Sequence, residues 1–142
     1  MFVKSVDHIG IAVKSIEDTL PFYTKTLGLN CIAMEEVVSE QVRVAFLEAK
    51  NVKIELLEST NPTGAISKFI EKRGEGIHHI AFNVHSIEHR IDEIKEQGFR
   101  MLNDIPKQGA AGAMVAFMHP KSSHGVLYEF CEKKPLEGTG SD

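Results

Sequence analysis

Two histidines and two glutamates recur at matching places in two copies of one sequence pattern. His8 opens the run His-Ile-Gly-Ile-Ala-Val, and His79 opens His-Ile-Ala-Phe-Asn-Val, 71 positions later. Glu55 and Glu129 lie in two later runs, Ile-Glu-Leu-Leu-Glu and Tyr-Glu-Phe-Cys-Glu, 74 positions apart. A charged side chain is costly to bury in an apolar strand unless something pairs with it. A divalent cation held by all four side chains would resolve that cost in both copies.

Two imidazoles and two carboxylates suit a first-row metal ion, and the pattern therefore predicts cobalt, zinc, nickel, manganese or iron rather than calcium. Four protein ligands leave one or two coordination positions open. A substrate oxygen can bind there and have its negative charge stabilised while a proton leaves the neighbouring carbon.

Other interpretations of these residues are open at this point. A single histidine on an apolar strand is typically a hydrogen-bonded structural residue, and either glutamate could face solvent from an edge strand. His78 competes with His79 for the ligand role. The register with His8 favours His79, since it puts Asp7 and His78 together on the opposite, outward-facing side of their strands.

The repeat organises the elements that must position these residues. Alternation predicts the first strand, Ser15 predicts a helix cap, and Gly28 a helix end. In the first copy we expect a strand over 6–13, a helix over 15–27, and strands over about 30–37, 42–48 and 52–57.

The second copy predicts the same order, with a strand over 79–84 and a helix between a cap at Ser86 and Gly98. Residues 44–46 match 115–117 at the offset of 71, and a longer loop over 119–125 shifts the last strand by three residues. Residues 59–76 predict a linker that includes a helix over 65–72.

The sequence thus predicts a single α+β domain over 1–134, in which two tandem βαβββ modules, about 5–58 and 77–133, form a curved mixed sheet around a cleft. The polar, glycine-rich tail over 135–142 is predicted to be disordered.

Composition excludes several classes of function. The chain has 142 residues, 42% of them hydrophobic, and a net charge of −4. It has no basic cluster for nucleic acid and no apolar run long enough for a membrane, and we expect a cytoplasmic protein. Cys31 and Cys131 lie in apolar runs and are predicted to be buried thiols.

At these residues the chain resembles the vicinal oxygen chelate superfamily, which includes glyoxalase I, extradiol dioxygenases, resistance proteins and methylmalonyl-CoA epimerase. The resemblance covers about 5–133 and is greatest to the methylmalonyl-CoA epimerase family. It rests on the motifs at residues 7–13, 53–58, 76–82, 117–121 and 125–127. Where glyoxalases more often have an acidic Asp-Pro-x-Gly turn, this chain reads His119-Pro120-Lys121.

The resemblance implies a metal-dependent 1,1-proton transfer that interconverts 2R and 2S methylmalonyl-CoA through an enolate stabilised by the metal. A base is needed on each face of the carbon, and Glu129 is the candidate for one. Some members carry a catalytic glutamate near the place of Val44, and some have glutamine where this chain has Glu55. Symmetry suggests Glu55 as the second base. A homodimer acting on a small-molecule thioester is the family expectation.

Substrate contacts are predicted in the glycine-containing loop over 106–112 and the turn that follows the next strand. Lys107 and Lys121 could attract a carboxylate or CoA phosphates, near Gly109 and Gly112, although solvated lysines are the default. Histidines without a counterpart in the repeat are assigned to the surface: His85, His89 and His124.

Two other functions compete with epimerisation. Glyoxalase I uses the same kind of four-ligand site to isomerise a glutathione hemithioacetal, and the segment 58–61 is similar to its glutathione region. A non-catalytic binding protein of the resistance type would hold a ligand in the same cleft, but such proteins commonly lack the metal ligands.

Overall fold

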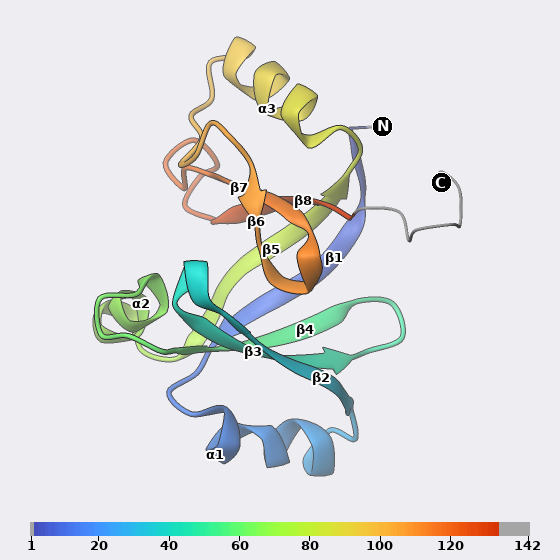
Figure 1. The fold of residues 1–142 in the computed structure, drawn as a ribbon, viewed down its shortest axis with the longest axis vertical. Coiled ribbons are helices and arrows are strands. Elements are labelled where there is room, and N and C mark those ends of the chain that lie inside the picture. The colour runs from blue at the N-terminus through green and yellow to red at the C-terminus, as the bar shows by residue number, and fades with distance from the viewer. Residues whose placement is uncertain (1, 134–142) are drawn as a thin grey trace. The chain divides into compact units, whose positions relative to one another are not determined.

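The order of helices and strands in the structure, a computed structural model that describes residues 2–133, is that of two βαβββ modules (Figure 1). The predicted tail over 135–142 lies outside the described residues. The described chain forms two compact units: an N-terminal unit of residues 6–81, and a C-terminal unit of residues 2–5 and 82–133. β1 and β5 each run through both units. This is the α+β class predicted from the repeat.

The N-terminal unit is built on a mixed sheet with the strand order β2-β3-β4-β1-β5. β1 lies parallel to β4, pairing His8 with Lys53 and Gly10 with Glu55. β2 and β4 both pair antiparallel with β3. The strands are β1 (Val3–Ala12), β2 (Asn30–Val37), β3 (Val42–Glu48), β4 (Lys53–Ser59) and β5 (Gly76–Val84).

The helix of the first module follows its predicted start. Ser15 caps α1 (Ile16–Pro21) by accepting a hydrogen bond from the Asp18 N–H at 3.1 Å. Beyond Pro21 the chain continues as a wider π-helical turn over Phe22–Thr26, because proline supplies no N–H to the regular helical ladder. Apolar side chains from α1, β3 and β4 form the core of this unit: Val13, Ile16, Ala45, Leu47 and Leu56. α2 (Ala65–Arg73) is the predicted linker helix.

The C-terminal unit repeats the arrangement with the strand order β5-β8-β7-β6. The prediction of a loop over 106–112 is wrong in part, since β6 (Lys107–Gln108) pairs with Val115 and Met114 of β7. The remaining elements are α3 (Ile87–Glu96), β7 (Met114–Met118) and β8 (Tyr128–Glu132). Its core joins buried side chains of these elements: Val84, Ile87, Ile91, Ile94, Met101, Ala116 and Phe130.

Each βαβββ module also caps its helix with a glutamate from its last strand. Glu58 accepts a hydrogen bond from the Ile16 N–H at 2.7 Å, and Glu132 accepts one from the Ile87 N–H at 3.0 Å. Ser86 precedes α3 as predicted, but its side chain makes no capping bond. Its N–H instead donates to Glu132 at 3.0 Å. These two glutamates end the same repeated runs that carry Glu55 and Glu129.

Two further expectations concern the burial of the cysteines and the absence of a membrane-spanning segment. Cys131 is buried as predicted, but Cys31 is exposed because β2 is the outer strand of its sheet. Within residues 2–133 no helix has the length and apolar character needed to cross a bilayer.

Candidate metal centre

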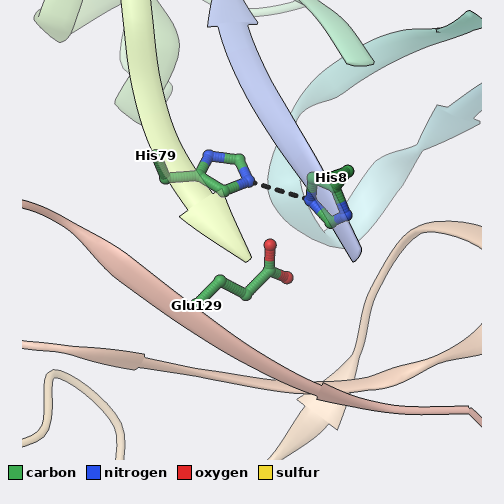
Figure 2. Close-up of side chains that lie close together, drawn as sticks. All are labelled: His8, His79 and Glu129. Carbon is green, nitrogen blue, oxygen red and sulfur yellow. Dashed lines mark hydrogen bonds between the residues drawn. The ribbon is translucent and has the colours of Figure 1, made fainter. Parts of the chain in front are cut away.

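The two repeated histidines face each other in the N-terminal unit. His8 on β1 and His79 on β5 are both 6% exposed, and their Nε2 atoms lie 3.1 Å apart (Figure 2). The rings meet nearly edge to face, with an interplanar angle of 85°. The two histidines that hold equivalent positions in the repeat therefore contact each other through the same atom, Nε2.

The other nitrogen of His8 meets two buried carboxylates. Its Nδ1 lies 2.7 Å from Asp7 Oδ2 and 3.2 Å from Glu55 Oε2. Lys53 Nζ lies 3.7 Å from the same Asp7 oxygen. Asp7 is 7% exposed and Glu55 is 4% exposed. The expectation that Asp7 faces outward is wrong: its carboxylate is buried and contacts the ring of the next residue.

Gly10 leaves the space that the ring of His79 occupies. A Cβ added there would lie 2.3 Å from Cε1 and 2.6 Å from Nδ1 of His79. Real Cβ atoms essentially never come within 3.0 Å of such atoms. Any residue larger than glycine would therefore displace the histidine, which explains the glycine two positions after His8.

His78 contacts His79 rather than His8. Its Nδ1 lies 3.0 Å from Nδ1 of His79, and its ring packs against Phe69 with centroids 5.0 Å apart. Of the two adjacent histidines, His79 is thus the one whose Nε2 faces His8, as the register with the first copy predicted.

The donor set fits a first-row metal ion. Only one of two facing imidazole nitrogens can carry the proton of an N–H···N bond, whereas a cation accepts both lone pairs. Zinc-to-nitrogen bonds of about 2.0–2.1 Å allow two nitrogens on one ion to be up to about 4.2 Å apart, and the observed 3.1 Å falls within that limit. Buried carboxylates beside the rings supply the matching negative charge.

Three of the four predicted ligands belong to the N-terminal unit, and Glu129 belongs to the C-terminal unit. The structure joins His8 to His79 through Nε2 and to Glu55 through Nδ1. Glu129 belongs to β8 of the C-terminal unit, is 6% exposed and is also labelled in Figure 2. The alternative in which the glutamates face solvent is wrong for both. Glu55 thus lies on the Nδ1 side of the His8 ring.

The predicted substrate residues lie apart from this cluster in sequence. Lys107 and Lys121 are exposed, and Gly109 packs against the Val115 side chain, with 3.0 Å between an added Cβ and Cγ2. Gly112 has a φ of +73°, which favours glycine. The histidines assigned to the surface are exposed: His85, His89 and His124.

Sequence reasoning missed three residues of this cluster: Asp7, Gly10 and Lys53. Asp7 directly precedes a candidate ligand, and an acidic residue beside a metal-binding histidine is itself a signal for a partner of that histidine. Gly10 breaks the β-branched run of its strand, which indicates a close approach. Lys53 is paired with His8 only through the strand register, which local spacing does not reveal.

The duplicated βαβββ modules and their mixed sheet define the chain as a glyoxalase-like α+β domain. A family model for the glyoxalase/bleomycin resistance protein/dioxygenase superfamily matches residues 7–117. The chain belongs to this superfamily.

Similar proteins within this superfamily include methylmalonyl-CoA epimerases. The chain is 41% identical to the uncharacterised protein YqjC of Bacillus subtilis over 129 residues, 91% of this chain and 92% of YqjC. It is 39% identical to the ethylmalonyl-CoA/methylmalonyl-CoA epimerase of Cereibacter sphaeroides, covering 87% of this chain and 94% of that protein. A solved methylmalonyl-CoA epimerase in complex with methylmalonyl-CoA is 35% identical, with a TM-score of 0.88 and coverage of 95% and 98%.

Proposed function

We propose that this protein is a metal-dependent methylmalonyl-CoA epimerase. The observation that carries the proposal is the pair of buried Nε2 atoms of His8 and His79, 3.1 Å apart, with the buried Glu55 carboxylate on the same imidazole. The relatives add the substrate class, since epimerases at 33–39% identity cover 87–92% of this chain. One solved relative holds methylmalonyl-CoA itself.

In this proposal His8, His79, Glu55 and Glu129 hold one divalent ion. Its charge would stabilise the negative charge that develops on the thioester when the proton leaves the neighbouring carbon. Each of the four side chains is at most 6% exposed, and burial would strengthen that electrostatic effect.

The proton moves between the carbon and two carboxylates. On one face a glutamate carboxylate accepts the α-proton, and on the other face the second glutamate, in its acid form, donates one, so that the configuration inverts and the charge balances. Glu129 and Glu55 are the two candidates. Val44, near the place where some members carry a catalytic glutamate, is aliphatic and 1% exposed, so it cannot exchange a proton.

The test is incubation with methylmalonyl-CoA in deuterated water, with and without a chelator. Mass spectrometry should show deuterium uptake at the α-carbon that the chelator abolishes and added metal restores. Turnover of methylglyoxal with glutathione and none of the thioester would instead assign a glyoxalase I activity. Thioester binding without exchange or bound metal would assign a binding protein.

The variant Glu55→Gln separates the two roles of Glu55, because an amide keeps a ligand oxygen but cannot act as a base. Starting from pure 2R or pure 2S substrate, we expect exchange to be lost from one epimer and kept from the other, with metal content unchanged. Glu48→Gln, at an exposed glutamate of β3, is the matched control. Full exchange from both epimers in Glu55→Gln would remove Glu55 as the second base.

A homodimer is part of the proposal as a family expectation. Sedimentation of the purified protein tests it, with a single species of 15.8 kDa as the contrary result.

A further inference from the structure

We propose that Asp7 is a positioning residue of the metal centre, which fixes the ring of His8 so that Nδ1 carries the proton and Nε2 faces the metal. The inference rests on the metal centre of the proposed function, but not on its substrate. In this role Asp7 contacts the metal-binding residue His8 and does not itself bind the ion.

The distances around Nδ1 favour Asp7 over Glu55 as the partner of this nitrogen. An N–H can donate one good hydrogen bond, and Asp7 Oδ2 at 2.7 Å is nearer than Glu55 Oε2 at 3.2 Å. Charge-assisted bonds between nitrogen and carboxylate oxygen are typically about 2.7–2.9 Å long. Asp7 is therefore the nearer carboxylate partner of His8 Nδ1.

Lys53 lies beside this carboxylate. Its Nζ lies 3.7 Å from the same Asp7 oxygen, and its backbone position on β4 is the register partner of His8. When a carboxylate oxygen accepts a hydrogen bond from His8 Nδ1, the ring presents its lone pair at Nε2. The lysine thus helps to hold the Asp7 carboxylate in place beside His8.

The second copy of the module repeats this arrangement with a different chemistry. His78 precedes His79 as Asp7 precedes His8, and its Nδ1 contacts the Nδ1 of that ligand histidine at 3.0 Å. One ligand imidazole therefore has a carboxylate as its partner and the other has a second imidazole. A carboxylate partner raises the basicity of a ligating imidazole, so His8 is the stronger of the two metal ligands.

The experiment measures zinc affinity by competition with a chromogenic chelator in the wild type, Asp7→Asn, Lys53→Met and the control Asp104→Asn. Asp104 is an exposed aspartate of the C-terminal unit. Loss of such an orienting partner typically weakens metal binding by about 10- to 100-fold, which is the loss expected for Asp7→Asn. A smaller loss is expected for Lys53→Met, and none for Asp104→Asn. Thermal unfolding of the metal-free proteins separates this effect from a purely structural one.

The outcomes distinguish this inference from the proposed function. Wild-type zinc binding with an equal affinity in Asp7→Asn would overturn the role of Asp7 alone. A wild type that binds no metal would overturn both proposals. Zinc binding without epimerase activity would leave Asp7 supported and the substrate assignment wrong.

A measurement on the wild type keeps the inference testable if Asp7→Asn does not fold. Long-range proton–nitrogen NMR of the zinc-loaded protein should show His8 protonated at Nδ1 and bound to zinc through Nε2. The opposite tautomer would overturn the proposal.

Discussion

Replacing Gly10 by alanine tests the packing on which the histidine pair depends. The added methyl carbon would lie 2.3 Å, 2.6 Å and 2.8 Å from Cε1, Nδ1 and Nε2 of His79. Ordinary contact begins at 3.4 Å, so the ring must withdraw by about 1 Å. Metal-to-ligand distances tolerate changes of only about 0.2 Å. His79 would therefore cease to be a ligand in Gly10→Ala.

The expected magnitude follows from these distances. Weakening a ligand indirectly costs about 10- to 100-fold in metal affinity, so displacing one outright should cost about 100-fold or more, or about 2.8 kcal/mol. Overpacking a buried site also lowers the free energy of unfolding, by about 1–3 kcal/mol. Chelator competition measures the first quantity, and denaturation of the metal-free protein measures the second.

A double-mutant cycle with His79→Ala makes the reasoning refutable. Without the ring, the methyl group at position 10 has space, and alanine should stabilise the strand by up to about 0.5–1 kcal/mol relative to glycine. If Gly10→Ala costs the same stability with and without the His79 ring, the steric explanation fails. Metal affinity that is unchanged in Gly10→Ala would refute the ligand role of His79.

Two further predictions concern the helix caps and the effect of pH. Glu58→Ala and Glu132→Ala should each lower the free energy of unfolding by about 0.5–2 kcal/mol in chemical denaturation, whereas the exposed Glu48→Ala should not; equal effects would contradict the capping role. Burial, with a smaller effect of the charge on Glu75, raises the pKa of Tyr23 above its ordinary value of 10.0. The folded protein therefore holds this proton more tightly than the unfolded chain, so the contribution of Tyr23 to stability is complete below pH 10 and is lost as the pH rises through the folded-state pKa. Thermal unfolding should show this decline above pH 10, and Tyr23→Phe should lack it.

Much of the fold could be predicted because its signals are local. The extended segment predicted over 42–48 has the bounds of β3, and Ser15 marked the first helix through its own side chain. The internal repeat then carried the assignment from the first module to the second. β6 could not be predicted in this way, since two residues carry no periodicity.

The candidate site was only partly accessible from the sequence. The offset of 71 identified His8 and His79, because duplication leaves equivalent residues at equivalent places. The burial of Asp7 contradicts simple alternation, which assigns neighbouring residues of a strand to opposite faces. Lys53 contacts Asp7 because β1 and β4 pair in a parallel register. The two residues are separated by 45 others in the chain, and the spacing within either strand does not reveal this pairing.

The capping glutamates have a consequence for the order in which the chain acquires its structure. The Ile16 N–H of α1 donates to Glu58, 42 residues further along the chain, and the Ser86 and Ile87 N–H groups at the start of α3 donate to Glu132, 46 and 45 residues further along. An isolated helix of about ten residues is marginal in water. During synthesis we therefore expect each helix to become stable only after the strand that carries its capping glutamate, β4 for α1 and β8 for α3, has left the ribosome. The stability of α3 therefore depends on the last strand of its module, and a truncation within β8 that removes Glu132 would destabilise this helix.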